Sequence, residues 1–374
     1  MRWIFEEDFN MNKRKMKMIG VALGLTLAAV PFDATGVASA AKAAKPAPLQ
    51  IAEQGVFSAG GKVVTSPGTF VPEDQWEATG KGQTAHVDHA SVLYQRPVKE
   101  TGKPMVFLHG YGQSRTGWIT TPDGREGWAE DFLRKGHSVY LLDAPHRGEA
   151  GATSTPGIIS DKTLDQRWYT QFRIGRWENG RSVANKGSKF PNDDRSVDQF
   201  FRQMTPDTGM KSDMGADFQH ETVATAVAAS VDAVFEQTGK DAVLVTHSQG
   251  GRAGWKVPAH TDHVAAIVAV EPGGAPAVDS DDYRVLVAKK VPVLFLFGDY
   301  IDNGDPKLQA TAAWIKMRQT CYDFAKAYTA AGLTAEVVDL PKAGFTGNDH
   351  FIFEDTNSAE VATFVENWLK KNVK

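Results

Sequence analysis

Cysteine is almost absent from this chain of 374 residues, because Cys321 is the only one. A single thiol cannot form a disulfide within the chain, so the fold must be held together by its hydrophobic core. No internal repeat is visible either. The composition therefore favours one large globular domain without cross-links.

A strong charge of either sign is also missing, because 41 basic residues oppose 45 acidic ones and the net charge is −4. Such a mild charge gives no general attraction to nucleic acid or to an anionic membrane. The apolar run over residues 18–30 is too short to span a bilayer comfortably. We therefore expect no nucleic-acid partner and no stable membrane insertion.

The N-terminal region has the three parts of a secretory signal peptide. Residues 11–17 are basic, residues 18–30 are apolar, and Ala38-Ser39-Ala40 is a small-residue cleavage site. We expect cleavage after residue 40, which removes 5 basic and 4 acidic side chains and changes the net charge to −5. The mature protein is then periplasmic or secreted. The acidic residues 1–10 do not fit such a signal and indicate an upstream start that is not the true one.

The remainder of the chain alternates between short apolar runs and helical segments. Residues 41–50 are rich in Ala, Lys and Pro and are predicted to be a disordered spacer, followed by one α/β domain over residues 51–374. The predicted strands are 55–64, 85–94, 104–108, 138–142, 242–245, 264–270, 292–297 and 334–340. Helices are predicted at 123–135 and 220–235 and from Ser358 onward, with Asn357 as the cap. This order indicates a mostly parallel, doubly wound sheet.

The alternation stops over residues 151–219, which are polar, rich in glycine and unusually aromatic. Val197, Phe200, Phe201 and Met204 are spaced as one face of an amphipathic helix. By analogy with α/β hydrolases, an insertion at this point is a helical lid over the pocket. Most of its aromatic residues are expected to form the lid's own core, and a few to line an apolar pocket.

The segment around Ser248 is the most informative part of the sequence. A buried strand runs directly into Thr246-His247-Ser248-Gln249-Gly250, and a helix can follow. A serine at such a strand-to-helix turn is typical of the nucleophile elbow of α/β hydrolases, although Thr246 stands where the usual pattern has glycine. Ser248 is thus the candidate nucleophile, and the backbone N–H of Gln249 is a candidate oxyanion donor.

A second informative loop follows the predicted strand 104–108 and reads His109-Gly110-Tyr111-Gly112. A His-Gly pair at this place usually supplies the other oxyanion donor in this fold, here the backbone N–H of Tyr111. An ordinary glycine-rich turn would fit the loop alone, and the elbow is what favours the catalytic interpretation. Farther along, Asp143, His146 and Arg147 are predicted to form a structural turn.

The chain order nucleophile, acid, histidine is expected for this fold. His350 is the only histidine after the two candidate acids, whereas His247, His260 and His263 precede both and fit structural or surface roles. Glu271 follows the strand 264–270 and Asp299 follows the strand 292–297. Most α/β hydrolases place the acid at the position of Asp299 and a minority at that of Glu271, so the spacing leaves both open.

Three segments resemble a small family of secreted bacterial esterases, typified by an Alcaligenes esterase whose elbow lacks the usual glycines. They are residues 121–136, the elbow His247-Ser248-Gln249, and Val270-Glu271-Pro272-Gly273. The resemblance implies a triad of Ser248, Glu271 and His350, oxyanion donors at Tyr111 and Gln249, and a homodimer. That family has adjacent cysteines where this chain has Tyr111 and Gly112.

The sequence thus predicts a secreted serine carboxylesterase that acts on a small-molecule ester through an acyl-enzyme. No cofactor and no metal are expected, because His86 and His89, beside Asp88, would point to opposite faces of a strand. An acyltransferase, amidase or lactonase could use the same triad. A non-catalytic binding protein of this fold is the alternative from another class, although such proteins usually lose a triad residue.

Overall fold

The computed structural model describes residues 47–74, 80–155, 164–208 and 217–374. The predicted signal peptide and most of the predicted spacer lie outside these residues. Within the described part, no helix is both long and apolar enough to cross a membrane. The compact unit Pro48–Lys374 contains every element described below.

An eight-stranded sheet forms the centre of this unit, in the order β1-β4-β6-β5-β9-β10-β11-β12. The strands are β1 (Ile51–Ala59), β4 (Ala90–Pro97), β5 (Met105–Leu108), β6 (Val139–Asp143), β9 (Ala242–His247), β10 (Val264–Val270), β11 (Val293–Phe297) and β12 (Ala335–Asp339). β1 pairs with β4, and β4 with β6, in antiparallel fashion, while β6, β5, β9, β10, β11 and β12 are parallel to one another. The predicted mostly parallel sheet is confirmed.

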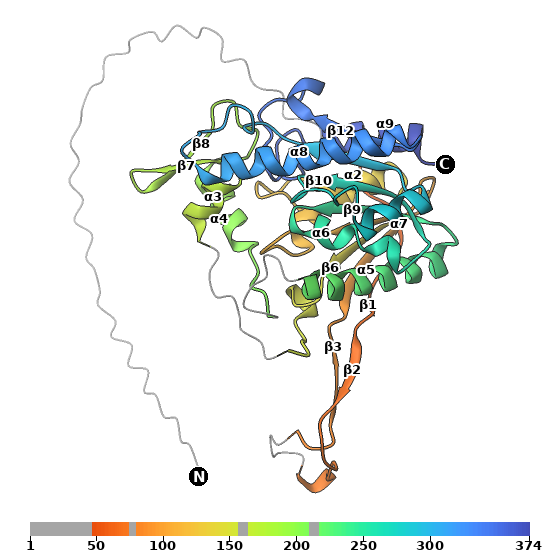
Figure 1. Cartoon of the computed structure of the whole chain (residues 1–374). Coiled ribbons are helices and arrows are strands. Elements are labelled where there is room, and N and C mark those ends of the chain that lie inside the picture. Colours follow the sequence, from red (N-terminus) through yellow and green to blue (C-terminus); the bar gives the residue numbers. More distant parts are fainter. Residues whose placement is uncertain (1–46, 75–79, 156–163, 209–216) are drawn as a thin grey trace, which may run out of the picture. The chain divides into compact units, whose positions relative to one another are not determined.

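The two predicted N-terminal strands are each divided in two. β2 (Lys62–Thr65) and β3 (Thr84–Val87) pair as an antiparallel hairpin that extends beyond the edge of the sheet (Figure 1). Gly60 and Gly61 have φ angles of 68° and 77°, and Asp88 has a φ of 59°. Residues in the left-handed conformation cannot continue the pleat of a strand, so each predicted strand is interrupted at these positions.

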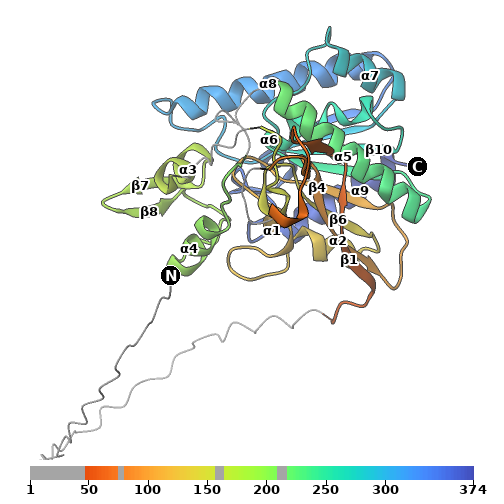
Figure 2. The same ribbon diagram turned by 90° about the horizontal axis from the view of Figure 1, so that it is seen from below.

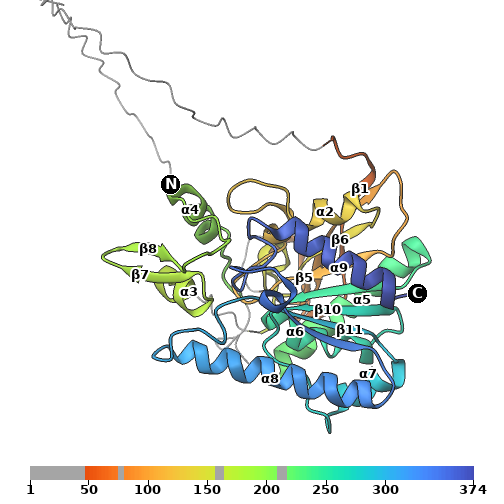
Figure 3. The same cartoon turned by 90° about the horizontal axis from the view of Figure 1, so that it is seen from above.

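Helices cover both faces of the sheet, as expected for a doubly wound fold (Figure 3). On one face α2 (Trp128–Arg134) packs against α9 (Ser358–Asn372). The other face carries α5 (Asp217–Thr238), α6 (Gln249–Gly254), α7 (Asp281–Lys289) and α8 (Gln309–Ala330). Neither α7 nor α8 was among the helices predicted from the sequence.

Two helix predictions were wrong in detail. The helix predicted from residue 123 begins at Trp128, because Thr120 and Glu126 form an antiparallel bridge that closes a turn before it. Asn357 stands at the N-cap position of α9, but its side chain exchanges hydrogen bonds of 2.7 and 3.1 Å with Asn348 instead of capping the helix. This pairing fixes the loop that carries His350.

The insertion between β6 and α5 is not purely helical. It contains α3 (Asp165–Gln171), the strands β7 (Gly175–Glu178) and β8 (Arg181–Ala184), and α4 (Asp194–Arg202), which lie together in Figure 2. The two strands form a tight hairpin because Asn179 and Gly180 both have positive φ angles, as this type of turn requires. The predicted amphipathic helix corresponds to α4, whose Phe200 packs against Phe190.

The central parallel strands are buried on both faces and form the main core. Phe107 of β5 is completely buried, and its ring centroid lies 5.2 Å from that of Trp118 and 6.0 Å from that of Phe132. These aromatic contacts therefore fix β5 to the helical segments that carry Trp118 and Phe132.

The variant Phe107→Ala should lose about 3–5 kcal/mol of unfolding free energy, because it removes a buried ring and leaves a cavity. Guanidinium denaturation of both proteins measures this difference. Phe70→Ala is the matched control, since Phe70 is 46% exposed and its loss should change stability little. Equal losses in the two variants would contradict the expected role of Phe107 in the core.

Candidate active site

Ser248 lies in the turn between β9 and α6 with φ 51° and ψ −119°, a backbone conformation that residues other than glycine rarely adopt. Two glycines make room for this turn. A Cβ on Gly250 would come within 2.4 Å of the carbonyl oxygen of His109, and one on Gly110 within 2.9 Å of the Cβ of Ser248. The elbow and the loop after β5 are therefore in direct contact.

The atypical first residue of the elbow has a simple explanation. The side chain of Thr246 points at α6, where a Cβ on Gly254 would come within 2.7 Å of the Thr246 methyl group. The glycine usually found at the start of the motif is thus replaced by a glycine eight residues later, on the helix. The contact keeps the strand and the helix close, and the turn at Ser248 is retained.

The loop after β5 is held by His109. Its Nδ1 lies 2.9 Å from the carbonyl oxygen of Gly110, and the backbone N–H of Ala144 donates to its Nε2 over 3.1 Å. Burial lowers the pKa of His109 to about 4, so the ring is neutral at neutral pH. Nδ1 therefore carries the proton and Nε2 accepts, which connects this loop to the turn after β6.

Glu271 follows β10 with a φ of 48° and is completely buried. Its Oε2 lies 3.2 Å from Nδ1 of His350, and its Oε1 accepts hydrogen bonds from Arg173 (2.6 Å) and from the backbone N–H of Gly298 (2.5 Å). Burial alone would raise the pKa of this carboxyl, but the charge of Arg173 and the hydrogen bond with His350 more than offset it. The pKa of Glu271 is therefore below its usual value, and the group is ionised.

His350 is enclosed by aromatic rings. Its imidazole stacks on Phe172 at 4.7 Å between ring centroids, and Trp314 lies at 4.5 Å. Burial lowers the pKa of His350 to about 4, although Glu271 acts in the opposite direction. The neutral ring donates Nδ1–H to Glu271, which leaves Nε2 with a lone pair and with no hydrogen-bond partner. Ser248 and His350 are thus not hydrogen-bonded to each other in this structure.

The other candidate acid, Asp299, has its carboxylate occupied by backbone N–H groups. One oxygen accepts from Tyr300 at 2.8 Å and the other from Gly347 at 3.0 Å. The backbone N–H of Asp299 also donates to the carbonyl oxygen of Asn348. Asp299 therefore holds the loop that carries His350, while Glu271 contacts the imidazole itself.

His247 connects the two loops of the site. Its Nδ1 lies 2.9 Å from the side-chain amide of Gln113, and its Nε2 lies 3.0 Å from the carbonyl oxygen of His350. Burial lowers the pKa of His247 well below its usual value, so the neutral ring has only one N–H. The partner atoms are both oxygens, Oε1 of Gln113 and the His350 carbonyl, so the neutral ring donates to one of them. The structural role predicted for His247 fits these contacts.

Arg173 was not identified from the sequence. It follows α3 in the insertion with a φ of 65°, and besides Glu271 it contacts the carbonyl oxygen of Asp299 at 3.1 Å. Its guanidinium lies 4.8 Å from the ring of Trp314. These partners are far away in the chain, so no local pattern could have marked this arginine.

The predicted structural turn after β6 is held by Asp143, which accepts hydrogen bonds from the backbone N–H groups of Arg115 (2.9 Å) and Glu149 (3.1 Å). His146 pairs with the buried Asp88 at 2.9 Å. Of the remaining histidines, His260 contacts Glu221 at 2.6 Å and His263 contacts Asp241 at 3.0 Å, both near the surface.

Ser248 lines a small cavity of about 70 Å³. The other lining residues come from the loops after β5 and β10, the insertion, α6 and α8: Tyr111, Gln171, Phe172, Gln249, Arg252, Gly273, Trp314 and Met317. Phe172 is the aromatic residue that the insertion contributes. No group of His, Cys, Asp or Glu in the described residues could hold a metal ion.

Three buried acids lie close to His350 in the sequence: Asp349, Glu354 and Asp355. Burial raises the pKa of Asp349 to about 7 and the pKa values of the other two well above normal, and each acid is close to another. Neither carboxylate oxygen of Glu354 has a hydrogen-bond partner. Burial therefore favours the protonated, neutral form of Glu354.

Comparison with known proteins agrees with this fold. Residues 103–323 match the family described as alpha/beta hydrolase fold. A probable secreted lipase of a fungal species (strain ATCC 74256) is 26% identical over 326 residues, covering 72% of this chain and 82% of that protein. A solved bacterial esterase is 29% identical, with a TM-score of 0.72, and the match covers 88% of this chain and 99% of that one.

The buried acid predicts a specific pH dependence. As pH rises above about 4.5, Glu354 ionises in the unfolded chain but stays protonated in the folded one. Its contribution to stability is complete below that pH and is lost as pH rises toward the folded pKa. Relative to the wild type, Glu354→Gln should gain unfolding free energy between pH 5 and 8, by at most about 1.4 kcal/mol per pH unit.

Denaturant unfolding of both proteins across this range measures the effect. Glu360→Gln is the control, because Glu360 is exposed on α9 and its profile should run parallel to that of the wild type. A profile of Glu354→Gln that also runs parallel would show that Glu354 is ionised in the folded protein.

Proposed function

Because the chain belongs to the alpha/beta hydrolase fold family, we propose that it is a serine carboxylesterase that hydrolyses small-molecule esters. The observation that carries the proposal is Ser248 in its strained turn, together with the buried pair of His350 and Glu271. The likeness to a bacterial esterase over nearly the whole chain, and to a probable secreted lipase, supports the same chemistry.

The proposed reaction begins when Ser248 Oγ attacks the ester carbonyl while Nε2 of His350 takes its proton. Glu271 accepts Nδ1–H and stabilises the imidazolium that forms. The negative oxygen of the tetrahedral intermediate accepts hydrogen bonds from the backbone N–H groups of Tyr111 and Gln249. His350 then gives its proton to the departing alcohol, and the acyl group stays on Ser248.

Hydrolysis of this acyl-enzyme repeats the steps with water in place of the serine. His350 takes a proton from the water, which attacks the acyl carbonyl, and returns it to Ser248 as the acid leaves. In the unliganded enzyme Nε2 has no partner. Catalytic hydrogen bonds often tighten only in the substrate complex, so the contact with Ser248 forms as substrate binds.

The alternative enzymes differ from an esterase either in the molecule that attacks the acyl-enzyme or in the bond that is cleaved. An acyltransferase passes the acyl group to another alcohol or amine, and an amidase or lactonase differs in the bond that is cleaved. The preference for ester hydrolysis rests on the two relatives above. Export to the periplasm or the medium fits a secreted relative, whereas the homodimer implied by the resemblance stays a prediction.

Covalent labelling tests the proposal directly. A fluorophosphonate should attach to Ser248 in the wild type with one adduct per chain, located by peptide mass spectrometry, and Ser248→Ala should lose both the adduct and p-nitrophenyl ester hydrolysis. Ser230→Ala is the control, because Ser230 is also buried but donates to a helical carbonyl oxygen. Absence of an adduct in the folded wild type would favour a non-catalytic binding protein.

The acid is identified by comparing Glu271→Gln with Asp299→Asn. We expect the larger fall in kcat for Glu271→Gln, on the order of 10⁴-fold as for the acid of other triads, because the amide can no longer orient and stabilise the imidazolium. Asp299→Asn should weaken the loop that carries His350 and lower kcat less. Steady-state kinetics normalised to labelled Ser248 decides between them, and the reverse order would assign the role to Asp299.

A further inference from the structure

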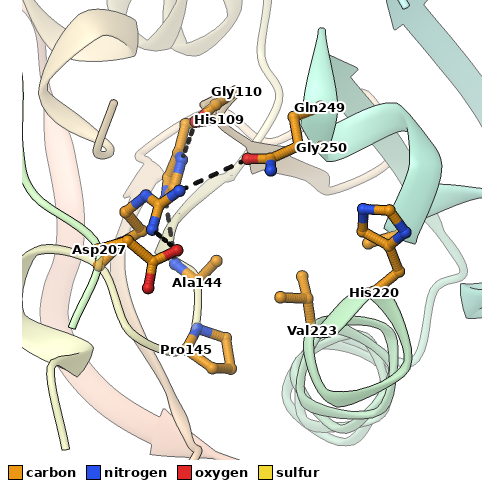
Figure 4. Close-up of a pocket in the computed structure, with 11 residues that line it drawn as sticks. His109, Gly110, Ala144, Pro145, Asp207, His220, Val223, Gln249 and Gly250 are labelled. Carbon is orange, nitrogen blue, oxygen red and sulfur yellow. Dashed lines mark hydrogen bonds and ion pairs between the residues drawn. The ribbon is translucent and has the colours of Figure 1, made fainter. Parts of the chain in front are cut away.

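A second small cavity, of about 30 Å³, lies behind the proposed oxyanion hole (Figure 4). Gly110 and Gln249 lie on one side of it, and His220 and Val223 of α5 on another. The mechanism above uses none of the charged groups that line it. Arg147 and Asp207 are nevertheless both almost completely buried there.

Arg147 contacts both residues whose backbone N–H groups are the proposed oxyanion donors. Its Nη2 donates to Oε1 of Gln249 over 3.5 Å, and its guanidinium carbon lies 5.8 Å from the centre of the Tyr111 ring. Its Nη1 forms an ion pair with Asp207. Each contact to a donor residue is weak alone, but a planar guanidinium can make all three at once.

The backbone around Arg147 is itself fixed. Its N–H donates to the carbonyl oxygen of Ala144 over 3.0 Å, and its carbonyl accepts from Ala150 over 2.8 Å. A Cβ on Gly148 would lie 2.4 Å from the carboxylate of Asp143, so the turn packs tightly against this acid. Arg147 therefore projects from a rigid base.

The insertion is hydrogen-bonded to both the oxyanion loop after β5 and the turn after β6. The backbone N–H of Thr205 donates to the carbonyl oxygen of Gly112 over 2.9 Å, and that of Thr208 to the carbonyl oxygen of His146 over 3.0 Å. Asp207 lies between these two anchors and pairs with Arg147. The end of the insertion is thus attached to the oxyanion loop and to the turn after β6.

Tyr111 receives a second aromatic contact from the insertion. Its ring stacks on Trp168 of α3 at 5.7 Å, with an angle of 22° between the ring planes. Trp168 also stacks on Phe351, the residue after His350, at 6.2 Å. The insertion therefore contacts the oxyanion loop and the histidine loop through one side chain.

We propose that Arg147, Asp207 and Trp168 are positioning residues that hold the oxyanion hole in its working geometry. Donors stabilise an oxyanion only if they are already in place when the charge develops. The loop that carries Tyr111 has glycines on both sides, one with a φ of 60°, and glycine restrains the backbone least, so rigidity at Tyr111 must come from other contacts. The ring of Tyr111, held by Trp168 and Arg147, supplies that rigidity.

This inference rests on the proposed function, so its test separates the two. The variants Arg147→Met, Arg147→Lys and Trp168→Leu are assayed with p-nitrophenyl acetate, and kcat is expressed per fluorophosphonate-labelled site. We expect kcat to fall about tenfold or more, below the 10²–10³ limit for complete loss of one donor, with KM changed less than about threefold. Arg147→Lys should recover part of the loss, because it keeps the charge near Asp207.

The affinity of a trifluoromethyl ketone, which adds to Ser248 and forms an oxyanion, should fall in parallel with kcat. Glu366→Gln is the control for a merely structural effect, since it breaks a buried pair with His137 at the opposite end of the strands. Unchanged kcat in Arg147→Met and Trp168→Leu, or an equal fall in Glu366→Gln, would overturn the positioning role. An unlabelled, inactive wild type would instead overturn the proposed function.

Discussion

The rest of the site depends on the buried carboxylate of Glu271. Removing an ion from water costs on the order of several kcal/mol, so the group is stable only with a complete set of partners. Arg173 supplies the opposite charge, Gly298 a backbone N–H, and His350 the remaining hydrogen bond. Because Arg173 belongs to the insertion between β6 and α5, the charge balance of the proposed triad depends on that insertion.

The parts of the fold that the sequence predicts well are those determined by neighbouring residues. The strand from residue 264 to 270 and the strand-to-helix turn at Ser248 follow from short apolar runs and a compact motif. The exceptions come from distant contacts. α8 was missed because its buried face includes Arg318, which pairs with Asp302 and Asp339 and interrupts the apolar stripe.

The same reasoning applies to the site. The candidate residues could be named from chain order, but spacing could not choose between Glu271 and Asp299. The choice depends on which carboxylate meets the imidazole, and the backbone N–H groups that occupy Asp299 come from Tyr300 and from residue Gly347, 48 positions away. The roles of Arg173 and Gln113 could not be predicted for a similar reason, since an arginine or a glutamine in a loop has no characteristic sequence pattern.

The single cysteine has a practical consequence for studying this molecule. Cys321 is completely buried in α8, and burial raises the pKa of its thiol, so it stays unreactive at ordinary pH. A cysteine introduced at Arg181, an exposed position of the β7–β8 hairpin, would then be the only thiol that a fluorescent dye could reach. The native chain is already a clean background for spectroscopic observation of that hairpin during turnover.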